Sequence, residues 1–361
     1  MIGKPLSLYF HIPFCTKKCP YCNFYVLPNK PIFQEKLIDG LRQEWKQLTP
    51  LIEKGTLVSL YFGGGTPSLF DLKYLQEILS WIPSQEIEIT LEANPEDLSL
   101  EKAKALRAAG INRLSLGVQS LDDELLKKIG RNHSASQAIN RCEKAGFENL
   151  SIDLMYDLPG QTLSTWEKTI QTAVKLPITH VSLYNLTIEP HTSFYRSQKA
   201  IESQMPGDET SLQMYIRAQE MLQSHGLTQY EISAFGTPSL HNSGYWSGRN
   251  FLGLGPSAFS FWEGTRKRNI CHLNRYQKMV ASGLRPIDFT ETLPPLAQER
   301  EKLAINLRLL KGVSDLPIDR ECLKIIDSLI ADGFLKKNAG SISLTQKGIL
   351  FYDTVASEII L

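Results

Sequence analysis

The sequence from residue 9 to residue 24 reads Tyr-Phe-His-Ile-Pro-Phe-Cys-Thr-Lys-Lys-Cys-Pro-Tyr-Cys-Asn-Phe. It contains three cysteines, Cys15, Cys19 and Cys22, in the spacing Cys-x3-Cys-x2-Cys. A loop with this spacing brings three thiolates to one face of a [4Fe-4S] cubane, where each ligates one iron. The fourth iron then lacks a protein ligand, so it is a place where a small molecule can bind and react.

Two other uses of these cysteines are open on sequence grounds. The three thiolates and His11 could hold a structural zinc ion, although zinc ligands usually come as two separated pairs. A disulfide would leave one cysteine over, and the N-terminus lacks the charged-then-apolar pattern of a signal peptide, so we expect a reducing compartment. We therefore predict that Cys15, Cys19 and Cys22 bind an iron-sulfur cluster.

Composition is typical of a cytoplasmic protein with one large core and a smaller one. The chain has 361 residues, of which 42% are hydrophobic, and a formal net charge of +1. That charge gives no overall field that would attract nucleic acid or an acidic membrane. The longest apolar stretches, 57–62 and 251–261, are too short or too rich in glycine to span a bilayer. We expect a protein without an intrinsic membrane segment.

Strand and helix patterns alternate over the first two thirds of the chain. The predicted strands are 6–11, 57–62, 86–92, 113–117, 149–155 and 180–186. The predicted helices are 32–48, 68–81, 99–109, 134–145, 162–175 and 208–225. This α/β alternation predicts a parallel sheet with right-handed crossovers. Periodicity leaves open whether the sheet forms a full barrel, a partial barrel or an open doubly wound sheet.

Unusual residues follow the ends of these strands, where parallel α/β folds place their active sites. The cysteine loop follows the first strand and Gly63-Gly64-Gly65 follows the second. The triplet could be an ordinary flexible turn, but at this edge its backbone amides could approach a small ligand closely. Glu92 ends an apolar strand, so it is either a surface carboxylate or an inward one that needs a partner.

Several segments resemble the family of oxygen-independent coproporphyrinogen III oxidases and their relatives, which are radical S-adenosylmethionine (SAM) proteins. They are the run 9–15, the cysteine spacing, and the runs 63–68, 117–120 and 153–156. The resemblance covers nearly the whole chain and implies a partial (β/α)6 barrel with SAM chelated at the open iron. The positions that it implies for SAM binding are Tyr9, Gly64, Gly65, Thr66, Glu92, Gln119, Arg131 and Asp153. One departure is Asp157, where relatives usually have glycine.

The family contains two functional classes, and two features argue against the decarboxylating oxidase. The oxidase resembles Cys-x3-Cys-x2-Cys-x-Cys, whereas Phe24 occupies the fourth cysteine position here. The oxidase also has a longer N-terminal segment, whereas this sequence reaches the first cysteine at residue 15.

The run His241-Asn242-Ser243-Gly244-Tyr245-Trp246 resembles the H-N-x-x-Y-W motif of the haem chaperones within this family. An imidazole is a good axial ligand for haem iron, and the rings of Tyr245 and Trp246 could stack on the macrocycle. The alternative is a loop in which His241 bonds to the backbone and the two aromatic rings pack in a core. The resemblance implies haem binding by His241, Tyr245 and Trp246, and delivery of haem to acceptor proteins.

The character of the sequence changes after residue 293. Helical patterns at 296–310 and 318–332 precede short strands at 334–336 and 341–344 and a last helix from about residue 345. This order predicts a winged-helix-like α+β domain. Such domains often bind DNA, but residues 319–330 carry three acidic side chains against two basic ones, so we expect a packing domain instead.

We therefore predict three regions: a radical SAM barrel at 1–235, a connecting segment with the H-N-x-x-Y-W motif at 236–293, and the C-terminal domain at 294–361. The expected function is that of a haem chaperone with a [4Fe-4S] cluster and SAM, served by an electron donor. The alternatives are an oxygen-independent coproporphyrinogen III oxidase and a DNA-binding regulator. The sequence assigns no catalytic residue and leaves enzymatic activity and homodimer formation open.

Overall fold

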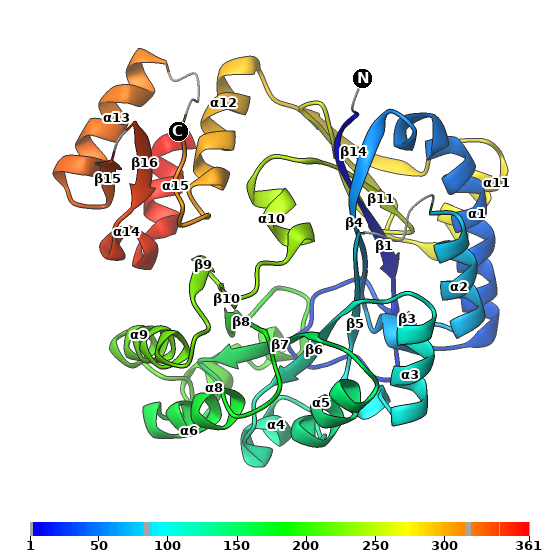
Figure 1. The fold of residues 1–361 in the computed structure, drawn as a ribbon, viewed down its shortest axis with the longest axis horizontal. Coiled ribbons are helices and arrows are strands. Elements are labelled where there is room, and N and C mark those ends of the chain that lie inside the picture. Colours follow the sequence, from blue (N-terminus) through cyan, green and yellow to red (C-terminus); the bar gives the residue numbers. More distant parts are fainter. Residues whose placement is uncertain (1–2, 83–86, 315–318, 339, 361) are drawn as a thin grey trace.

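A computed structural model describes residues 3–82, 87–314, 319–338 and 340–360, and its centre is a single curved sheet (Figure 1). Neighbouring parallel strands of this sheet are β1 (Lys4–Ile12), β4 (Gly55–Gly64), β5 (Glu88–Ala93), β6 (Arg113–Gln119), β7 (Asn149–Tyr156) and β8 (His180–Asn185). The predicted α/β fold with a parallel sheet is therefore confirmed. Residue 86, the first of the predicted strand 86–92, lies outside the described residues.

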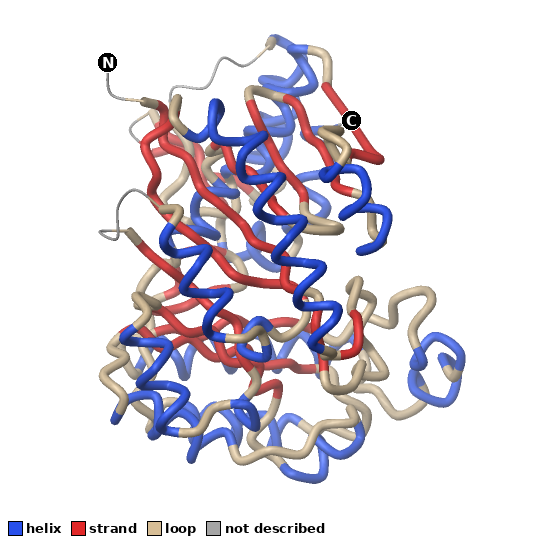
Figure 2. The backbone as a smooth tube through the Cα atoms, turned by 90° about the vertical axis from the view of Figure 1, so that its right-hand side faces the viewer, coloured by secondary structure: helices blue, strands red, loops and turns tan. Residues whose placement is uncertain are grey.

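Helices cover the convex face of this sheet, as Figure 1 shows and as Figure 2 shows from the side. They are α1 (Pro31–Ile52), α2 (Leu72–Ser80), α3 (Leu100–Ala108), α5 (Ala135–Lys144), α6 (Leu163–Ala173) and α9 (Asp208–Ser224). Sequence periodicity predicted each of them. It missed the shorter helices α4 (Asp123–Lys128), α7 (Ser193–Arg196) and α8 (Gln198–Glu202), which are too short to show a helical period.

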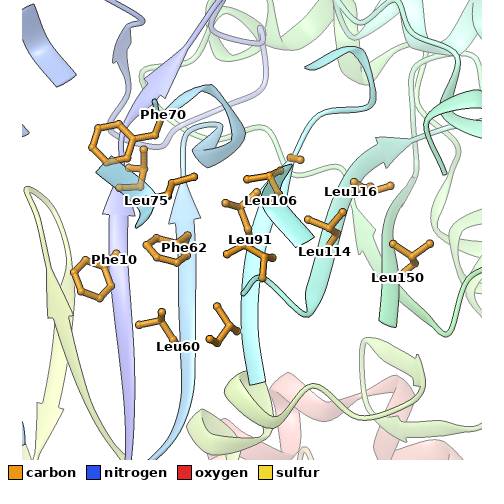
Figure 3. Close-up of a cluster of buried hydrophobic side chains, with 14 of the residues drawn as sticks. Phe10, Leu60, Phe62, Phe70, Leu75, Leu91, Leu106, Leu114, Leu116 and Leu150 are labelled. Atoms are coloured by element: carbon orange, nitrogen blue, oxygen red, sulfur yellow. The ribbon is translucent and has the colours of Figure 1, made fainter. Parts of the chain in front are cut away.

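Side-chain alternation gives the strands one apolar face and one polar face. Phe10, Phe62, Leu91 and Leu114 come from four adjacent strands and lie in one buried layer (Figure 3). Side chains from the covering helices, such as Leu75 of α2, complete this core. The opposite, concave face carries the tyrosine, glutamate, aspartate and serine side chains that the site uses.

The segment predicted to connect two domains also contributes strands to the sheet. β11 (Asn250–Leu254) pairs parallel with β1, and β12 (Phe259–Trp262), β13 (Thr265–Asn269) and β14 (Ile287–Thr292) follow it antiparallel. At the other end, β10 (Ala234–Gly236) and β9 (Gln229–Glu231) pair next to β8. The sequence analysis did not predict these strands. Five of the six have five residues or fewer, and β11 contains a glycine.

The remaining elements of this segment lie on opposite faces of the sheet. Helix α10 (Leu240–Trp246), which contains the H-N-x-x-Y-W run, lies inside the curve of the sheet and contacts β4 (Figure 1). Helix α11 (Leu273–Ala281) packs against α1 on the outside. The motif is therefore enclosed by the barrel rather than displayed on a surface loop.

The C-terminal residues form a small α+β unit with its own core. It contains α12 (Pro295–Asn306), α13 (Arg320–Ala331), the hairpin of β15 (Leu335–Asn338) and β16 (Ser341–Leu344), α14 (Gln346–Leu350) and α15 (Tyr352–Ile360). The predicted helix start at residue 318 lies outside the described residues. Among the described residues, no helix is long and apolar enough to cross a membrane.

Asp157, the departure from the family pattern, adopts a left-handed backbone conformation. Its φ is 63°, in the left-handed region that glycine reaches most easily and aspartate tolerates. Its carboxylate accepts a hydrogen bond from Ser211 Oγ at 2.7 Å, which ties this turn to α9.

Glu44 of α1 joins the outer helices to the strands that follow β11. Its carboxylate is fully buried and accepts hydrogen bonds from Gly255 N at 2.8 Å, Asn269 Nδ2 at 2.6 Å and Tyr276 Oη at 2.6 Å. Burial raises the pKa of Glu44. Because donors from the end of β11, from β13 and from α11 converge on it, Glu44 fixes the position of these elements against α1.

We expect Glu44→Ala to lower the free energy of unfolding by about 3 kcal/mol or more, because it leaves buried donors without an acceptor. Urea unfolding measures the loss. Glu35→Ala on the exposed side of the same helix is the control, with an expected change within about 0.5 kcal/mol. Equal stabilities of the two variants would contradict this role.

Candidate functional site

The three predicted cluster ligands lie together in a loop after β1. Cys15 ends the short strand β2 (Phe14–Cys15), which pairs with β3 (Leu27–Pro28). Within the loop, Cys22 N donates to Cys19 O at 3.2 Å. All three thiols are half-buried and none is in a disulfide. The loop therefore presents three thiols from a backbone that is fixed at both of its ends.

The surroundings of these thiols fit a cluster better than a zinc ion. Cys15 Sγ lies 3.6 Å from Thr66 Oγ1, and Cys19 Sγ lies 3.9 Å from Arg131 Nη1. Burial raises the pKa of Cys15 and of Cys22, so thiolates here need positive charge beside them. Both ring nitrogens of His11 already have partners, Tyr9 Oη at 3.0 Å and Tyr25 O at 3.3 Å.

A single metal ion has no ready site near these cysteines. Within the described ranges, no group of three or more His, Cys, Asp or Glu side chains is close enough to hold one ion. A cubane distributes its three thiolates over different irons, so it does not need them to converge on one atom. Three thiols in one loop match the number of protein ligands that a cubane with one open iron takes.

The glycine triplet packs directly against the cysteine loop. Gly64 has a φ of 118°, and a Cβ there would lie 2.6 Å from the ring of His11. A Cβ on Gly65 would lie 2.7 Å from Phe14 O. Thr66 N donates to Phe14 O at 2.7 Å, which fixes the triplet to the loop. Glycine is therefore required here by close approach, and the turn is not merely flexible.

Glu92 points to the concave face, where it has two partners. Tyr61 Oη donates to its Oε1 at 2.8 Å, and Gly64 N donates to its Oε2 at 3.0 Å. Burial is the largest cause that raises the pKa of Glu92 to about 7, and Asp153 adds to the effect. The Glu92 carboxylate thus bonds the backbone of the glycine triplet, and its pKa lies near neutral pH.

The other residues that the family resemblance implies for SAM lie at the same ends of the strands. Asp153 accepts a hydrogen bond from Ser115 Oγ at 3.4 Å, and burial raises the pKa of Asp153 to about 6. Arg131 Nη2 donates to Gly117 O at 2.6 Å. A Cβ on Gly117 would lie 3.0 Å from Arg131 Nη2 and 3.1 Å from Gln119 Nε2, so those two side chains meet above this glycine.

Tyr9 completes the concave side of the site. Its ring stacks on Tyr61 with centroids 6.1 Å apart, and Tyr61 bonds Glu92. The structure thus brings Tyr9, the glycine triplet, Thr66, Glu92, Gln119, Arg131 and Asp153 to the edge that carries the cysteine loop. Sequence reasoning did not single out Tyr61, although it lies two residues before Gly63 and therefore on the same face of β4.

The H-N-x-x-Y-W helix is held by groups far away in sequence. Glu88 of β5 accepts hydrogen bonds from Leu240 N and His241 N, both at 2.9 Å. His241 Nδ1 bonds Ser59 Oγ at 3.0 Å and its Nε2 bonds Tyr245 Oη at 2.8 Å. The histidine is only 1% exposed, and burial lowers its pKa to about 3.

His241 therefore sits behind Tyr245 as a neutral ring with both nitrogens engaged. Sequence reasoning missed Ser59 and Glu88. Glu88 could have been found from the sequence, because strand alternation puts its side chain on the same face as that of Glu92. No sequence pattern distinguishes Ser59 from other serines.

A cavity of about 770 Å³ lies between the concave face and α12. Its aromatic wall is formed by Tyr245, Trp246, Phe251, Phe259 and Phe261. Tyr9, His11 and Phe24 also line it, so it reaches the cysteine loop. Phe24, which occupies the position of the oxidase's fourth cysteine, has a side chain that is 62% exposed. Tyr245 and Trp246 reach the cavity, whereas His241 is not part of its wall.

Comparison with known proteins supports the radical SAM interpretation. The family model of the radical SAM superfamily matches residues 9–173. The solved structure of coproporphyrinogen III oxidase (HemN) from Escherichia coli has a TM-score of 0.85 and 24% identity, and the match covers 99% of this chain and 90% of that chain. At this identity the likeness concerns the fold, and it confirms the predicted radical SAM fold.

Curated relatives match over nearly the full chain. Heme chaperone HemW from Bacillus subtilis is 35% identical over 371 residues, which is 97% of each chain. The protein of that name from Lactococcus lactis is 38% identical, covering 87% of this chain and 84% of its own. The one from Haemophilus influenzae is 34% identical over 96% of both chains. The chain therefore belongs to the HemW family of heme chaperones, which has a radical SAM fold.

Proposed function

We propose that this protein binds a [4Fe-4S] cluster, SAM and haem in the cytoplasm and delivers the haem to haem-requiring acceptor proteins. The observation that carries the proposal is the cavity of about 770 Å³ with an aromatic wall, which adjoins the cysteine loop. Its volume lies in the range of ligand sites, and flat aromatic surfaces suit a macrocycle. The HemW relatives are named for the same task.

In this proposal Cys15, Cys19 and Cys22 hold the cluster, and the strand ends beside them hold SAM. Bound together, the cluster and SAM supply one-electron reduction of a sulfonium, for which an external electron donor is needed. The backbone of the glycine triplet and the carboxylates of Glu92 and Asp153 offer acceptors for the ammonium and hydroxyl groups of SAM. Arg131 places positive charge beside Cys19.

Tyr245 and Trp246 are the motif residues that face the cavity, so we propose that they contact the macrocycle. His241 supports Tyr245 through the hydrogen bond between Nε2 and Oη. It can serve as an axial ligand only if its imidazole gives up this bond and turns toward the cavity.

We expect anaerobically reconstituted protein to bind haem saturably at about one equivalent, without conversion of coproporphyrinogen III on the same sample. An absorbance titration and product analysis measure the two quantities. Trp246→Ala should weaken haem binding by about tenfold, because it removes part of the aromatic wall. The control is Leu240→Ala on the same helix, whose side chain is 46% exposed and outside the cavity. Turnover without haem binding would identify an oxidase instead.

Replacing Cys19 by serine should abolish the cluster, because two thiolates remain and Phe24 offers no substitute. Iron and acid-labile sulfide per chain, together with the visible absorbance, measure the loss. Cys271→Ser is the matched control, since Cys271 is exposed and lies outside the loop. Unchanged iron and sulfide in Cys19→Ser would refute the ligand assignment.

The affinity for SAM should increase as pH rises through about 7. The pKa of Glu92 is raised to about 7, so this carboxylate is neutral below that pH and negatively charged above it. The anionic form attracts the cationic ligand, which predicts about threefold to tenfold tighter binding at about pH 8 than at about pH 6. Calorimetry of the reconstituted protein measures it. Glu92→Gln should bind more weakly with a flatter pH profile, and an equally steep profile would point to another group.

A further inference from the structure

An arginine on the cavity wall is held by a carboxylate from the C-terminal unit. Arg266 of β13 lines the cavity, and Glu301 of α12 lines it on the other side. Arg266 Nη1 donates to Glu301 Oε1 at 2.7 Å, and Nη2 donates to Oε2 at 2.6 Å. Both side chains are about one quarter exposed, at 28% and 23%. The pair is therefore bidentate, partly shielded from water, and joins β13 to α12. Glu291 of β14 makes a longer contact to Arg266 Nη1, at 3.5 Å.

A second guanidinium lies on the same wall without a carboxylate partner. Arg249 Nη1 donates to Leu240 O at 2.9 Å and to Ser7 Oγ at 3.2 Å. Among the described residues, no carboxylate lies within ion-pair distance of it. Arg266 also lies over the ring of Phe261, 5.6 Å from its centroid. The cavity thus presents two guanidinium groups beside its aromatic residues, and of these two only Arg266 is in an ion pair among the described residues.

We propose that Arg266 binds a propionate of haem and that Glu301 occupies Arg266 while the cavity is unloaded. This inference rests on the proposed function. A haem carries two carboxylates on one edge of a flat apolar ring, and Arg249 is the group suited to the second. Arginine recognises a carboxylate by two parallel hydrogen bonds, and Glu301 already displays that geometry. Entry of haem exchanges one carboxylate for another at Arg266.

The exchange has a consequence for the C-terminal unit. Glu301 belongs to α12, so its release removes the bidentate tie between α12 and β13. The contacts that remain on this side involve Arg308, which lies 4.2 Å over the ring of Trp246 and pairs with Glu231 at 3.3 Å. Loading therefore loosens one of the ties that hold α12 over the cavity, which suits a protein that must release its cargo.

The test is a haem titration of the full chain by absorbance, with three variants. Arg266→Gln should weaken haem binding by about tenfold or more, because a charge-assisted carboxylate contact is lost. Glu301→Gln should strengthen it by up to about tenfold, because Arg266 loses its bidentate internal competitor and keeps only the longer contact to Glu291, at 3.5 Å. Arg268→Gln is the control: this arginine is on the same strand, pairs with Asp288 at 2.9 Å and lies outside the cavity wall.

A second probe, the dimethyl ester of haem, removes the propionate charges and keeps the ring and the iron. Wild type should bind the ester about tenfold more weakly than haem, and Arg266→Gln should show a smaller difference between the two probes, because only the Arg249 contact is then left to lose. Equal affinity of wild type for haem and ester, or no gain in Glu301→Gln, overturns the inference while haem binding itself stands. A wild type that binds neither probe overturns the proposed function instead. A gain of affinity in Glu301→Gln cannot come from misfolding.

Discussion

Strand β1 is hydrogen-bonded on both sides, to β4 and to β11, and the rest of the site depends on this pairing. Its register places Tyr9 beside Tyr61 and Gly253, and His11 beside Gly63. The cysteine loop therefore leaves the sheet from a fixed point, directly next to the glycine triplet that ends β4. Residues 250–254 form β11, so β1 and the cysteine loop after it are held on both sides only when this later part of the chain has folded against β1.

Strand alternation places the core side chains on one face of the sheet and the side chains of the candidate site on the other. Side chains such as Phe10 and Phe62 face the helices and form the core, whereas Tyr9 and Tyr61 face the enclosed concave side. Buried polar groups on that side need partners, and helix α10 supplies several of them. Glu88 is one example, since its carboxylate is satisfied by the first amides of α10. The motif helix is thus part of the internal hydrogen bonding of the barrel as well as a wall of the cavity.

Local patterns in the sequence predicted the six parallel strands from β1 to β8, the six longer helices on their outer face and the residues at the strand ends, because period, glycine runs and cysteine spacing are short-range signals. The partners of His241 were not predictable in this way: Ser59 lies 182 residues away, and only the closed barrel brings them together. The same applies to Glu44 with Tyr276, 232 residues apart. Arg266 and Glu301 are each ordinary surface-type residues in sequence, and their pairing across the cavity follows from how α12 lies against the sheet.

His241 links the two halves of the site through direct contacts. Its ring lies 4.8 Å from that of Tyr61, which bonds Glu92, which in turn holds Gly64. On its other side it bonds Tyr245 on the cavity wall. Removing the imidazole therefore disturbs the glycine triplet and the aromatic wall together, so weaker haem binding in a His241 variant would follow from either role of this residue. A changed axial ligand alters the absorption spectrum of bound haem, whereas a displaced Tyr245 alone lowers the affinity, and the spectrum rather than the affinity separates ligand from support.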